Sequence, residues 1–592
     1  MTKLIIFDKK EHVINNVKFI LDWESSVVTE KKTFLYLKNN QIKLPLDYIA
    51  FPWAFLLDIY CNKFNLFFSD FYDFIKNLGL LDLIKPNSNY ITTVQSYHLE
   101  KFLDTFNKIG IKYIFYPHSK ERKFLKTFYT YNIILIPYLI YPSIKGKILN
   151  KSIFYSFIGN INYNNKYTSD IRKKICNMKH SENCYIKAIN KWHFDDNVYG
   201  NQFKLIKYDK ENYKKNMNLR EENYKTILGK SLFSICPLGI GPNSIRLSES
   251  LIFNSIPVSI SDDLWFPFYL DIDWEKIIIK MEESKIDELL TLENLSFHEP
   301  DIINYQKNIY DFSNNFLSEN NYGNQVEIFF KPKNSYVLLI PWYNITDKLR
   351  YEEIHTCLEN NLQNKLIKKI IFFYECEDKS QIKYSTYQHE KISIIPIITN
   401  KKRDVNFNQI IDYCNKYLIN EMCIISNNDI YFDKTLGNLI DLDFINSNYF
   451  VSLTRKNCEA YLDKNNKIWK PHSASQDSWI FKSPIKPMPY HINLGWIQCD
   501  NIISHCYHNL GYKVINPHLS VNGWHLHKFN NTLNLLENYN YDYKYKMLKV
   551  PLKSIEEIKV EKYININSQN KLNMKKFVNL KKNFIKKTND IK

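Results

Sequence analysis

Short runs rich in β-branched residues alternate with longer amphipathic segments along most of the chain. Strand-like runs separated by helix-length segments are typical of α/β units, in which a helical crossover returns the chain to a parallel strand. The pattern therefore predicts an α/β fold with three layers of largely parallel sheet. The runs that we expect to be strands are 113–117, 133–137, 231–236, 256–261, 336–341, 370–374, 392–397 and 422–426.

Two polar, turn-forming stretches suggest where domains meet. At 592 residues the chain is several times longer than a single domain of roughly 100–200 residues, so several cores are expected. The clearer stretch, 315–335, contains Gly and Pro and directly precedes a new strand run; a softer one covers 143–150. The predicted segments are 1–150, 151–332, 333–535 and a basic C-terminal tail, 536–592.

Composition indicates a packed, enzyme-like chain with an excess of positive charge. Apolar residues make up 45% and the formal net charge is +17, which suits nucleic acid, an anionic membrane or anionic substrates such as nucleotide sugars. Basic residues gather only near the end, where 551–592 holds 11 Lys against 4 acids. A helix from residue 572 could contact an anionic membrane surface, and a solvated or frayed end is the open alternative.

Cysteine spacing and hydropathy bear on the compartment. The 11 cysteines show no CxxC pair, so we expect reduced, mostly buried thiols. The N-terminal residues carry early acids and no signal-peptide run. The longest apolar stretch, Tyr131–Pro142, is shorter than the ~20 residues of a membrane span. These features predict a cytoplasmic protein without a spanning segment, peripheral at the inner membrane face if the tail binds there.

A first group of chemically informative residues follows the strand predicted at 231–236. That strand ends in a glycine turn at Gly239, and Ser244 can cap the helix that follows. Turns of this kind bind phosphates in open α/β sheets. Arg246 and Glu249, inside the helix, could meet pyrophosphate and ribose hydroxyls. Their i,i+3 spacing equally fits a surface salt bridge, so spacing alone leaves both interpretations open.

The whole segment resembles the donor-binding segment of the exostosin family of glycosyltransferases. Weaker resemblance extends over about 90–330, through Ser156–Asn160 and Arg172, while Leu238 and Asn254 depart from the family pattern. The matching residues are Ser231, Phe233, Cys236, Pro237, Gly239, Ser244, Arg246, Leu247, Glu249, Ile256, Pro257, Val258, Ser261, Asp262, Pro267, Phe268, Asp273 and Trp274.

This resemblance implies a GT-B architecture, with two Rossmann-like domains facing across a cleft and inverting transfer without an obligatory metal. Residues 1–150 would be the acceptor-side domain, and 151–332 would bind the nucleotide sugar. The general base stays unassigned, because His98 and His118 are each more often structural residues at such positions. The implied donor-binding residues are Gly239, Ser244, Arg246, Glu249 and Asp262.

The segment 333–535 is predicted to be a separate α/β domain. A strand, a helix bearing Arg350 and a second strand open it, and the strand at 422–426 runs into Asn427, Asn428 and Asp429. A carboxylate at the tip of a buried strand can coordinate a divalent cation that bridges a donor diphosphate. An ordinary Asn/Asp turn is the alternative.

This segment resembles GT-A-like glycosyltransferases, with Asn427 in the first position of the Asp-x-Asp site. A Cys-Asp-Asn turn before a helix, a Gly-Tyr-x-Val-x-Asn-Pro strand and a terminal His-x-His carry the rest of the resemblance. It implies Asp500 as the catalytic base, whose alternative is a helix N-cap. The other implied residues are Asp477 as catalytic, Arg350, Arg403 and Asn427 as donor-binding, and Asp429, His525 and His527 as ligands of Mn or Mg.

Together these features predict a bifunctional glycosyltransferase that moves sugars, of hexosyl or hexosaminyl type and from UDP-sugar donors, onto a surface or capsular glycan or a glycolipid. One alternative is a single active module beside a non-catalytic glycan-binding one, which the departures at Leu238, Asn254 and Asn427 keep open. Another is a basic protein that binds nucleic acid or glycan. No zinc finger, RNA-binding aromatic motif or long arginine run supports it, so no nucleic-acid partner is expected.

Overall fold

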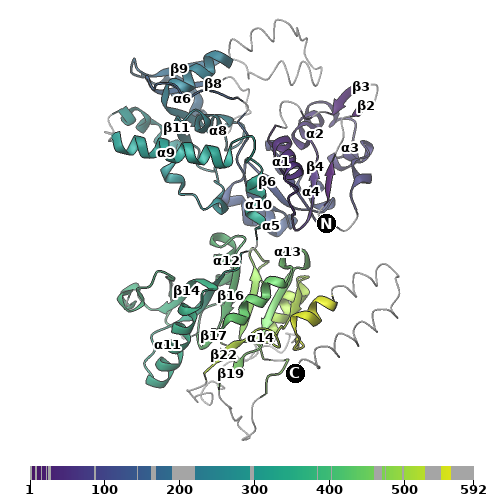
Figure 1. Ribbon diagram of the computed structural model, residues 1–592, viewed down its shortest axis with the longest axis vertical. Helices are drawn as coiled ribbons and strands as arrows, with labels where there is room; N and C mark the ends of the chain where they lie inside the picture. Colours follow the sequence, from purple (N-terminus) through teal and green to yellow (C-terminus); the bar gives the residue numbers. More distant parts are fainter. Residues whose placement is uncertain are drawn as a thin grey trace. The chain divides into compact units, whose positions relative to one another are not determined.

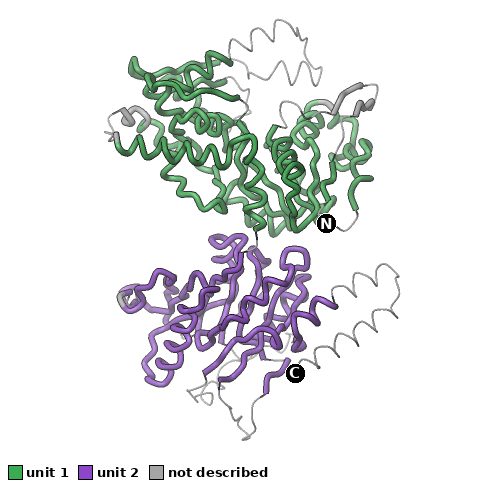
Figure 2. Tube along the Cα trace, in the orientation of Figure 1, with its two compact units in different colours: residues 1–331 green, residues 332–592 purple. Residues whose placement is uncertain are grey.

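The computed structural model divides the chain into two compact units, unit 1 (Met1–Lys331) and unit 2 (Pro332–Lys592), coloured separately in Figure 2. Each unit has its own sheets, shown in Figure 1, and its own buried cores. The residues that the structure describes are 3–6, 10–14, 17–21, 23, 28–85, 88–142, 144–161, 169–189, 221–293, 299–331, 333–382, 384–401, 403–458, 470–473, 475–495, 499–526 and 548–561.

The first sheet of unit 1 has five parallel strands in the order β1-β4-β5-β6-β7, which is also their order along the chain. A buried cluster of aromatic and aliphatic side chains, including Trp53 and Phe106, fills the space between this sheet and its helices. The elements are β1 (Leu4–Ile6), β2 (Lys10–Ile14) and β3 (Val17–Leu21) of a separate hairpin, α1 (Val28–Asn39), β4 (Asp47–Ala50), α2 (Trp53–Ile59), η2 (Tyr60–Phe64), α3 (Phe71–Asn77), η3 (Leu80–Leu83), β5 (Tyr90–Thr93), η4 (Tyr97–Lys101), α4 (Leu103–Lys108), β6 (Ile111–Tyr116), α5 (Glu121–Tyr131) and β7 (Ile134–Pro137).

The second sheet of unit 1 has the parallel order β12-β11-β10-β8-β9. Because β8 comes first in sequence and lies between β9 and β10, the strand order reverses at β8 and β10. Open sheets bind ligands outside the carboxyl ends of the strands at such a switch point. The elements are β8 (Ile153–Asn160), α6 (Ile171–Asn177), β9 (Tyr185–Ile189), β10 (Ser231–Pro237), α8 (Ile245–Ile252), β11 (Ile256–Ile260), η6 (Phe268–Leu270), η7 (Trp274–Lys276), β12 (Ile279–Met281), η8 (Glu283–Glu293), α9 (Glu299–Phe316) and α10 (Asn324–Phe330).

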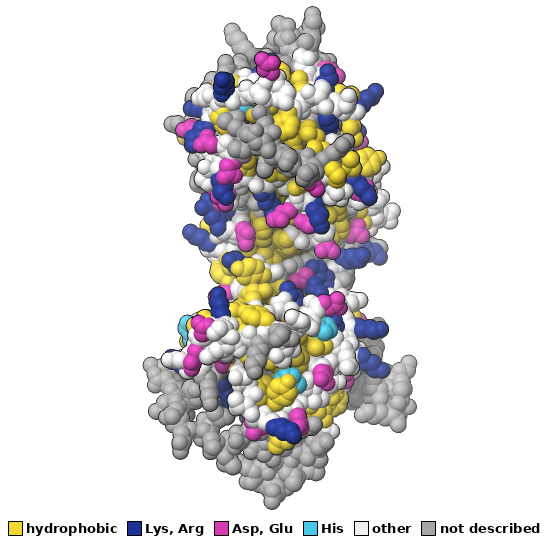
Figure 3. All heavy atoms as spheres, turned by 90° about the vertical axis from the view of Figure 1, so that its left-hand side faces the viewer, with side chains coloured by type: hydrophobic (Ala, Val, Ile, Leu, Met, Phe, Trp, Pro, Cys, Tyr) yellow, Lys and Arg dark blue, Asp and Glu magenta, His cyan; other side chains and the backbone are white. Residues whose placement is uncertain are grey.

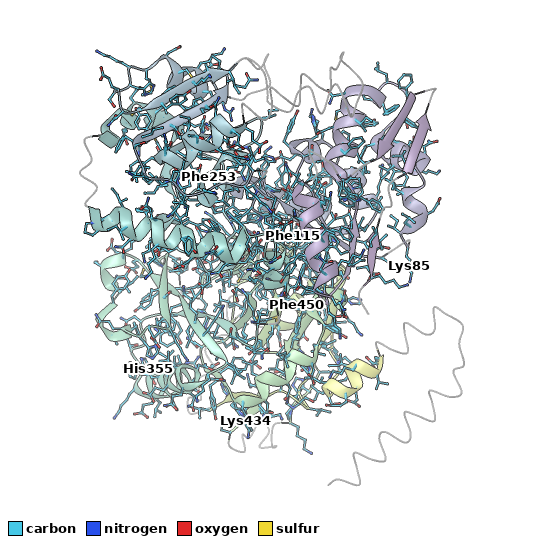
Figure 4. The ribbon with its side chains drawn as sticks, turned by 45° about the horizontal axis from the view of Figure 1, so that its top comes forward. Lys85, Phe115, Phe253, His355, Lys434 and Phe450 are labelled. Carbon is cyan, nitrogen blue, oxygen red and sulfur yellow. The ribbon has the colours of Figure 1, made fainter. Side chains whose placement is uncertain are left out.

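Helix α10 returns to the first sheet after the second is complete. The ring of Phe115 on β6, labelled in Figure 4, lies 5.7 Å from that of Phe329 and 6.0 Å from that of Phe330. The Tyr322 hydroxyl, just before α10, donates to the Leu139 carbonyl. These contacts join the last helix of unit 1 to its first half, so the two sheets form one compact body.

Unit 2 is built on a seven-stranded sheet in the order β15-β14-β13-β16-β20-β18-β21, in which only β20 runs antiparallel to its neighbours among the described strands. The alternating residues of β13 belong to two cores, with Leu338 on one face and Leu339 on the other. A small sheet, β17-β22-β19, lies beside it. The elements are β13 (Tyr336–Trp342), α11 (Lys348–Gln363), β14 (Ile367–Cys376), η9 (Lys379–Gln381), η10 (Tyr384–Tyr387), β15 (Ile392–Ile398), α12 (Phe407–Tyr417), β16 (Met422–Ser426), β17 (Ile430–Phe432), η11 (Lys434–Asp441), α13 (Phe444–Ser447), β18 (Tyr449–Leu453), β19 (Lys456–Asn457), β20 (Ser478–Lys482), α14 (Cys499–Asn509), β21 (Lys513–Ile515) and β22 (Gly523–His525).

The α/β prediction is confirmed, and each of the eight predicted strand runs overlaps a strand: β6, β7, β10, β11, β13, β14, β15 and β16. All 11 cysteines are free thiols, as expected. Within the described residues, no helix is long and apolar enough to cross a bilayer. Part of the predicted tail belongs to unit 2, because Ile555 and Ile558 are buried in one of its cores. The helix predicted from residue 572 lies outside the described residues.

Candidate functional sites

The loop between β10 and α8 lies at the switch point of the second sheet. We call Leu238–Asn243 the donor loop. The Gly239 amide donates to the Gly241 carbonyl at 2.9 Å, which makes a tight turn directly after the strand. Ser244 occupies the N-cap position of α8, but its side chain makes no capping hydrogen bond, so that part of the prediction was wrong. The Ser244 amide donates to the Asn243 side-chain oxygen at 2.8 Å.

Arg246 and Glu249 are brought together by Tyr224. The half-buried Arg246 guanidinium lies over the Phe157 ring, 4.8 Å from its centroid, and donates to the Tyr224 hydroxyl at 3.3 Å. That hydroxyl donates to Glu249 Oε2 at 2.8 Å. Glu249 is only 2% exposed. The pair is therefore an internal cluster under the donor loop and not a surface salt bridge; its donor-binding role stays a prediction.

Arg172 on α6 is a cation that the predicted donor set omitted. Its guanidinium donates to the Leu238 carbonyl at 2.9 Å and, more weakly, to the Asn160 and Pro237 carbonyls at 3.4 and 3.5 Å. It therefore bridges the carboxyl ends of β8 and β10. The signal in the sequence was the weaker part of the exostosin resemblance, in which Arg172 occurs.

Asp262 lies apart from this cluster in its hydrogen bonding. It follows β11, and its Oδ1 accepts from the Glu283 amide at 2.8 Å. The neighbouring Asp263 forms an ion pair with Arg122 from the first half of unit 1. Among the described residues, no hydrogen bond joins Asp262 to Arg246, so the structure does not link these two predicted donor residues.

The first half of unit 1 meets the donor loop at the carboxyl end of β6. The Asn243 side chain donates to the Pro117 carbonyl at 3.0 Å, and the imidazole of His118 lies directly against Gly241. Farther along, the Trp265 amide donates to the Ser119 carbonyl at 3.3 Å. The carboxyl ends of β6 and β10 therefore face each other across the donor loop.

A second cluster forms at the carboxyl end of β16 in unit 2, the switch point beside β13. Arg350, in the first turn of α11, donates to Asp429 Oδ2 at 2.8 Å, to Glu353 Oε2 at 2.7 Å and to Asn428 Oδ1 at 3.3 Å. His525 Nε2 lies 3.6 Å from Asp429 Oδ2. Burial alone would raise the pKa of Asp429, but the Arg350 charge and His525 hold it well below its ordinary value.

The predicted metal ligands are only partly described. Asp429 and His525 lie close together, whereas His527 is outside the described residues. The Arg350 guanidinium already contacts Asp429 Oδ2. Within the part of the chain that the structure describes, no group of three or more His, Cys, Asp and Glu side chains is arranged to hold a metal ion. The Asp429 carboxylate and the His525 imidazole are groups that can bind a divalent cation, but here the carboxylate is paired with the Arg350 guanidinium.

Asp477 and Asp500 form a pair of acids at the same edge of the sheet. Asp477 Oδ1 accepts from Arg455 at 2.8 Å and from the Asn427 side chain at 3.3 Å, while its buried Oδ2 has no hydrogen-bond partner among the described residues. Asp500 Oδ2 accepts from the Gln476 amide at 3.1 Å. Burial, helped by the nearby Asp477 charge, raises the pKa of Asp500 to about 6.

The alternative of Asp500 as an N-cap is wrong, because α14 begins at Cys499 and Asp500 lies inside its first turn. Arg403, a predicted donor residue, is exposed after β15 and donates to the Gly495 carbonyl at 3.1 Å. Its hydrogen bonds among the described residues are with Glu375 and Gly495, and not with either acid of the pair or with Asp429. Sequence reasoning also missed Glu353, which is 0% exposed and pairs with Arg350 at helical i,i+3 spacing.

Comparison with known proteins gives a family match over the region that contains the first cluster. Residues 133–295 match the family model of the exostosin GT47 domain. A probable glucuronosyltransferase of Oryza sativa subsp. japonica is 37% identical over 93 residues, 16% of this chain and 21% of that protein. A probable beta-1,4-xylosyltransferase, IRX10 of Arabidopsis thaliana, is 41% identical over 69 residues, 12% of this chain and 17% of that protein. The chain thus spans about a fifth of the length of these relatives.

Solved structures of low similarity were also found. The structure of residues 1–349 of TarS from S. aureus in complex with UDP-GlcNAc is 11% identical, with a TM-score of 0.25, and the match covers 35% of this chain and 62% of that one. Mannosyltransferase PcManGT from Pyrobaculum calidifontis, in complex with GDP-Man and Mn2+, is 11% identical with a TM-score of 0.23, over 33% and 57%. The exostosin resemblance is therefore confirmed for the central part of the chain, and the GT-A-like assignment stays a prediction.

Proposed function

We propose that this protein is a glycosyltransferase whose exostosin-like domain transfers a sugar from a nucleotide-sugar donor. The observation that carries the proposal is that the family match, 133–295, includes the switch point of the second sheet, with its donor loop and two guanidinium groups, Arg172 and Arg246. Arginine forks bind phosphate oxygens in two-point contacts, and the switch point is where open sheets hold nucleotides.

In this domain Arg172 and Arg246 bind the donor diphosphate, and Glu249 is the acceptor for ribose hydroxyls. Both guanidinium groups now donate to protein oxygens, so diphosphate would compete with carbonyls and the Tyr224 hydroxyl. Charge-assisted hydrogen bonds to phosphate are stronger than those to neutral carbonyls, so the exchange favours the donor. The proposal assigns no metal to this domain, so the two guanidinium groups supply the positive charge for the diphosphate.

The finer part of the proposal is that unit 2 is a second transferase, which makes the chain bifunctional and dependent on UDP-sugars. Its support is the convergence of Arg350, Asp429, Asp477 and Asp500 at the carboxyl edge of one sheet. Asp429, His525 and the undescribed His527 would hold a Mn or Mg ion, which when bound would neutralise charge on the leaving diphosphate. The Arg350 contact favours a competing version, in which the guanidinium supplies that charge itself.

Asp500 is the base of this second reaction. With a pKa of about 6 its carboxylate is mostly ionised at neutral pH and still basic enough to accept a proton. The proton of the acceptor hydroxyl passes to Asp500 while the hydroxyl oxygen bonds to the anomeric carbon, and the bond to the diphosphate oxygen breaks. Asp477 pairs with Arg455, and its charge adds to burial, the larger cause, in raising the pKa of Asp500.

The acceptor is a surface or capsular glycan or a glycolipid in this proposal, and the basic tail is the contact with an anionic membrane. The nucleic-acid alternative is less well supported. On the face drawn in Figure 3, Lys and Arg side chains are scattered among Asp and Glu, without the single-sign stripe that a nucleic-acid backbone requires.

A screen of nucleotide sugars for binding, hydrolysis and transfer, with and without manganese, tests the proposal. Arg246→Ala should abolish one activity and Asp429→Ala the other, and only the second activity should respond to manganese. If both variants leave all donor hydrolysis and transfer intact, the proposal fails. If one variant alone has an effect, the chain has a single active module beside a binding module.

A further inference from the structure

His118 occupies a position that connects the two sheets of unit 1. It lies just beyond the carboxyl end of β6, and its ring faces the donor loop beyond β10. A Cβ atom added to Gly241 would lie 2.5 Å from His118 Nδ1 and 2.9 Å from Cγ. No side chain fits there, so the glycine is what allows the donor loop to approach the imidazole.

The hydrogen bonding of the ring defines which nitrogen faces the loop. The imidazole is hydrogen-bonded to the backbone of Gln95. Its Nδ1 is buried and has no hydrogen-bond partner among the described residues. Nε2 therefore donates to the Gln95 carbonyl, and Nδ1 presents a lone pair toward Gly241. An unpaired buried acceptor is unfavourable, and such groups are found where a ligand supplies the missing donor.

The surroundings keep this imidazole neutral. Burial is the largest influence and lowers the pKa of His118 to about 4; Lys120 lowers it further, while the Glu100 charge and the Gln95 bond oppose the change. Glu100 is itself paired with Lys120 at 3.4 Å and with Lys123 at 2.6 Å. The residue of the donor loop that lies against the ring, Gly241, carries no charge. The lone pair on Nδ1 is therefore available at neutral pH.

The donor loop also separates His118 from the cations of the donor site. Arg172 Nη2 lies 3.7 Å from the position of a Cβ on Gly239, at the start of the loop, whereas His118 contacts Gly241. A donor diphosphate held by Arg172 would thus bring its sugar to the loop that His118 faces. The Asn243 side chain, at the end of this loop, donates to the Pro117 carbonyl and so connects the loop to the segment that bears His118.

We propose that His118 is the catalytic base of the exostosin-like domain, contributed by the first sheet to a donor bound on the second. The inference rests on the proposed function. For this step the donor loop moves Gly241 away from Nδ1, the acceptor hydroxyl takes its place, and the hydroxyl proton passes to that nitrogen. The hydroxyl oxygen forms a bond to the anomeric carbon, the bond from that carbon to the diphosphate oxygen breaks, and the nucleoside diphosphate leaves with the electron pair.

The imidazolium formed in this step lies near Glu100, whose negative charge stabilises it. The Gln95 carbonyl holds the ring in the tautomer that leaves Nδ1 unprotonated beforehand. Nothing comparable holds for His180, a histidine of the same unit whose two ring nitrogens lie 2.8 Å from the Tyr155 hydroxyl and 2.6 Å from the Ile175 carbonyl. His180 is thus a matched control with a satisfied structural ring.

The test uses the full chain carrying Asp500→Asn, so that the second module does not contribute to turnover. His118→Gln should lower kcat for transfer by about 10²- to 10⁴-fold, the usual contribution of a general base, with affinity for UDP unchanged. His180→Gln should keep the kcat of its parent. The parent's kcat/KM should stay level from pH 8 to pH 5.5, where an ordinary histidine of pKa about 6.5 would lose its activity.

Three outcomes separate the inference from the proposed function. If the parent chain neither binds nor turns over any nucleotide sugar, the proposed function fails. If it is active and His118→Gln transfers at the parental rate, His118 is not the base. If His118→Gln loses UDP binding, the smaller substitution His118→Asn replaces it in the test. The assignment is also overturned if His118→Asn keeps the parental kcat, whether or not its KM for the donor is raised.

Discussion

The pairing of Asp477 with Asp500 makes a specific claim about the pH dependence of the second module. Asp477→Asn removes the negative charge that helps to raise the pKa of Asp500, while an amide can still receive the Arg455 hydrogen bond. The pKa of Asp500 should therefore fall. Transfer by unit 2 needs the ionised carboxylate, so the acid limb of its pH profile should move to lower pH.

The size of the shift follows from the causes of the raised pKa. A rise from 3.8 to about 6 corresponds to about 3 kcal/mol, at about 1.4 kcal/mol per pKa unit. Burial is the largest cause and remains in the variant, so Asp477 accounts for the smaller share. We expect the acid limb to move from about pH 6 to about pH 5–5.5, a change of about 1 kcal/mol.

The measurement is kcat/KM for transfer between pH 4.5 and 8, in a chain carrying Arg246→Ala so that only unit 2 contributes. Asp441→Asn is the control, because this exposed acid pairs with Lys559 away from Asp500. Its acid limb should coincide with that of the parent. A limb that stays at pH 6 in Asp477→Asn, or moves upward, would refute the coupling of the two acids.

Three further changes have expected outcomes. Asp500→Asn should raise the free energy of unfolding by up to about 3 kcal/mol at pH 7, measured by chemical denaturation, and should not raise it below about pH 4. The reason is that a carboxyl whose pKa is raised in the folded state lowers stability only above its unfolded pKa. Equal stability of variant and parent at pH 7 would contradict this. Gly110→Ala should destabilise unit 1 by more than about 1 kcal/mol, since its φ is +86° and a Cβ would lie 2.1 Å from a backbone carbonyl oxygen, whereas Gly511→Ala, with φ +87° and open space, should cost less. Arg350→Met should raise the pKa of Asp429 and make the second activity more dependent on manganese; loss of that activity at every manganese concentration would instead favour the guanidinium as the cation.

The strands and the order of elements could be predicted because they follow from local pattern. Runs such as 231–236 and 422–426 are mostly apolar on both faces, as strands buried on both faces of a parallel sheet are. The switch points could not be read in this way, because strand order depends on which strands pair. That β8 pairs with β10, far along the chain, is a tertiary fact.

In the candidate sites, too, residues within a local motif could be predicted, whereas contacts that depend on the tertiary fold could not. Arg246 and Glu249 were found from a motif, but the Tyr224 hydroxyl that joins them comes from outside it. Asp477 and Asp500 were chosen separately, and the pKa of Asp500 is raised by burial and by the nearby Asp477 charge, both of which depend on the tertiary fold. Ser244 occupies the N-cap position without a capping hydrogen bond from its side chain, while its amide donates to the Asn243 side chain.

The most direct test of the central claim is whether a nucleoside diphosphate binds at the switch point of the second sheet. Titration calorimetry with UDP, on the full chain carrying Asp429→Ala to weaken the second site, should detect one binding event. Adding Arg246→Ala should weaken it by about 10- to 100-fold, because a charge-assisted hydrogen bond contributes about 1.5–3 kcal/mol. Equal UDP affinity with and without Arg246 would contradict the account.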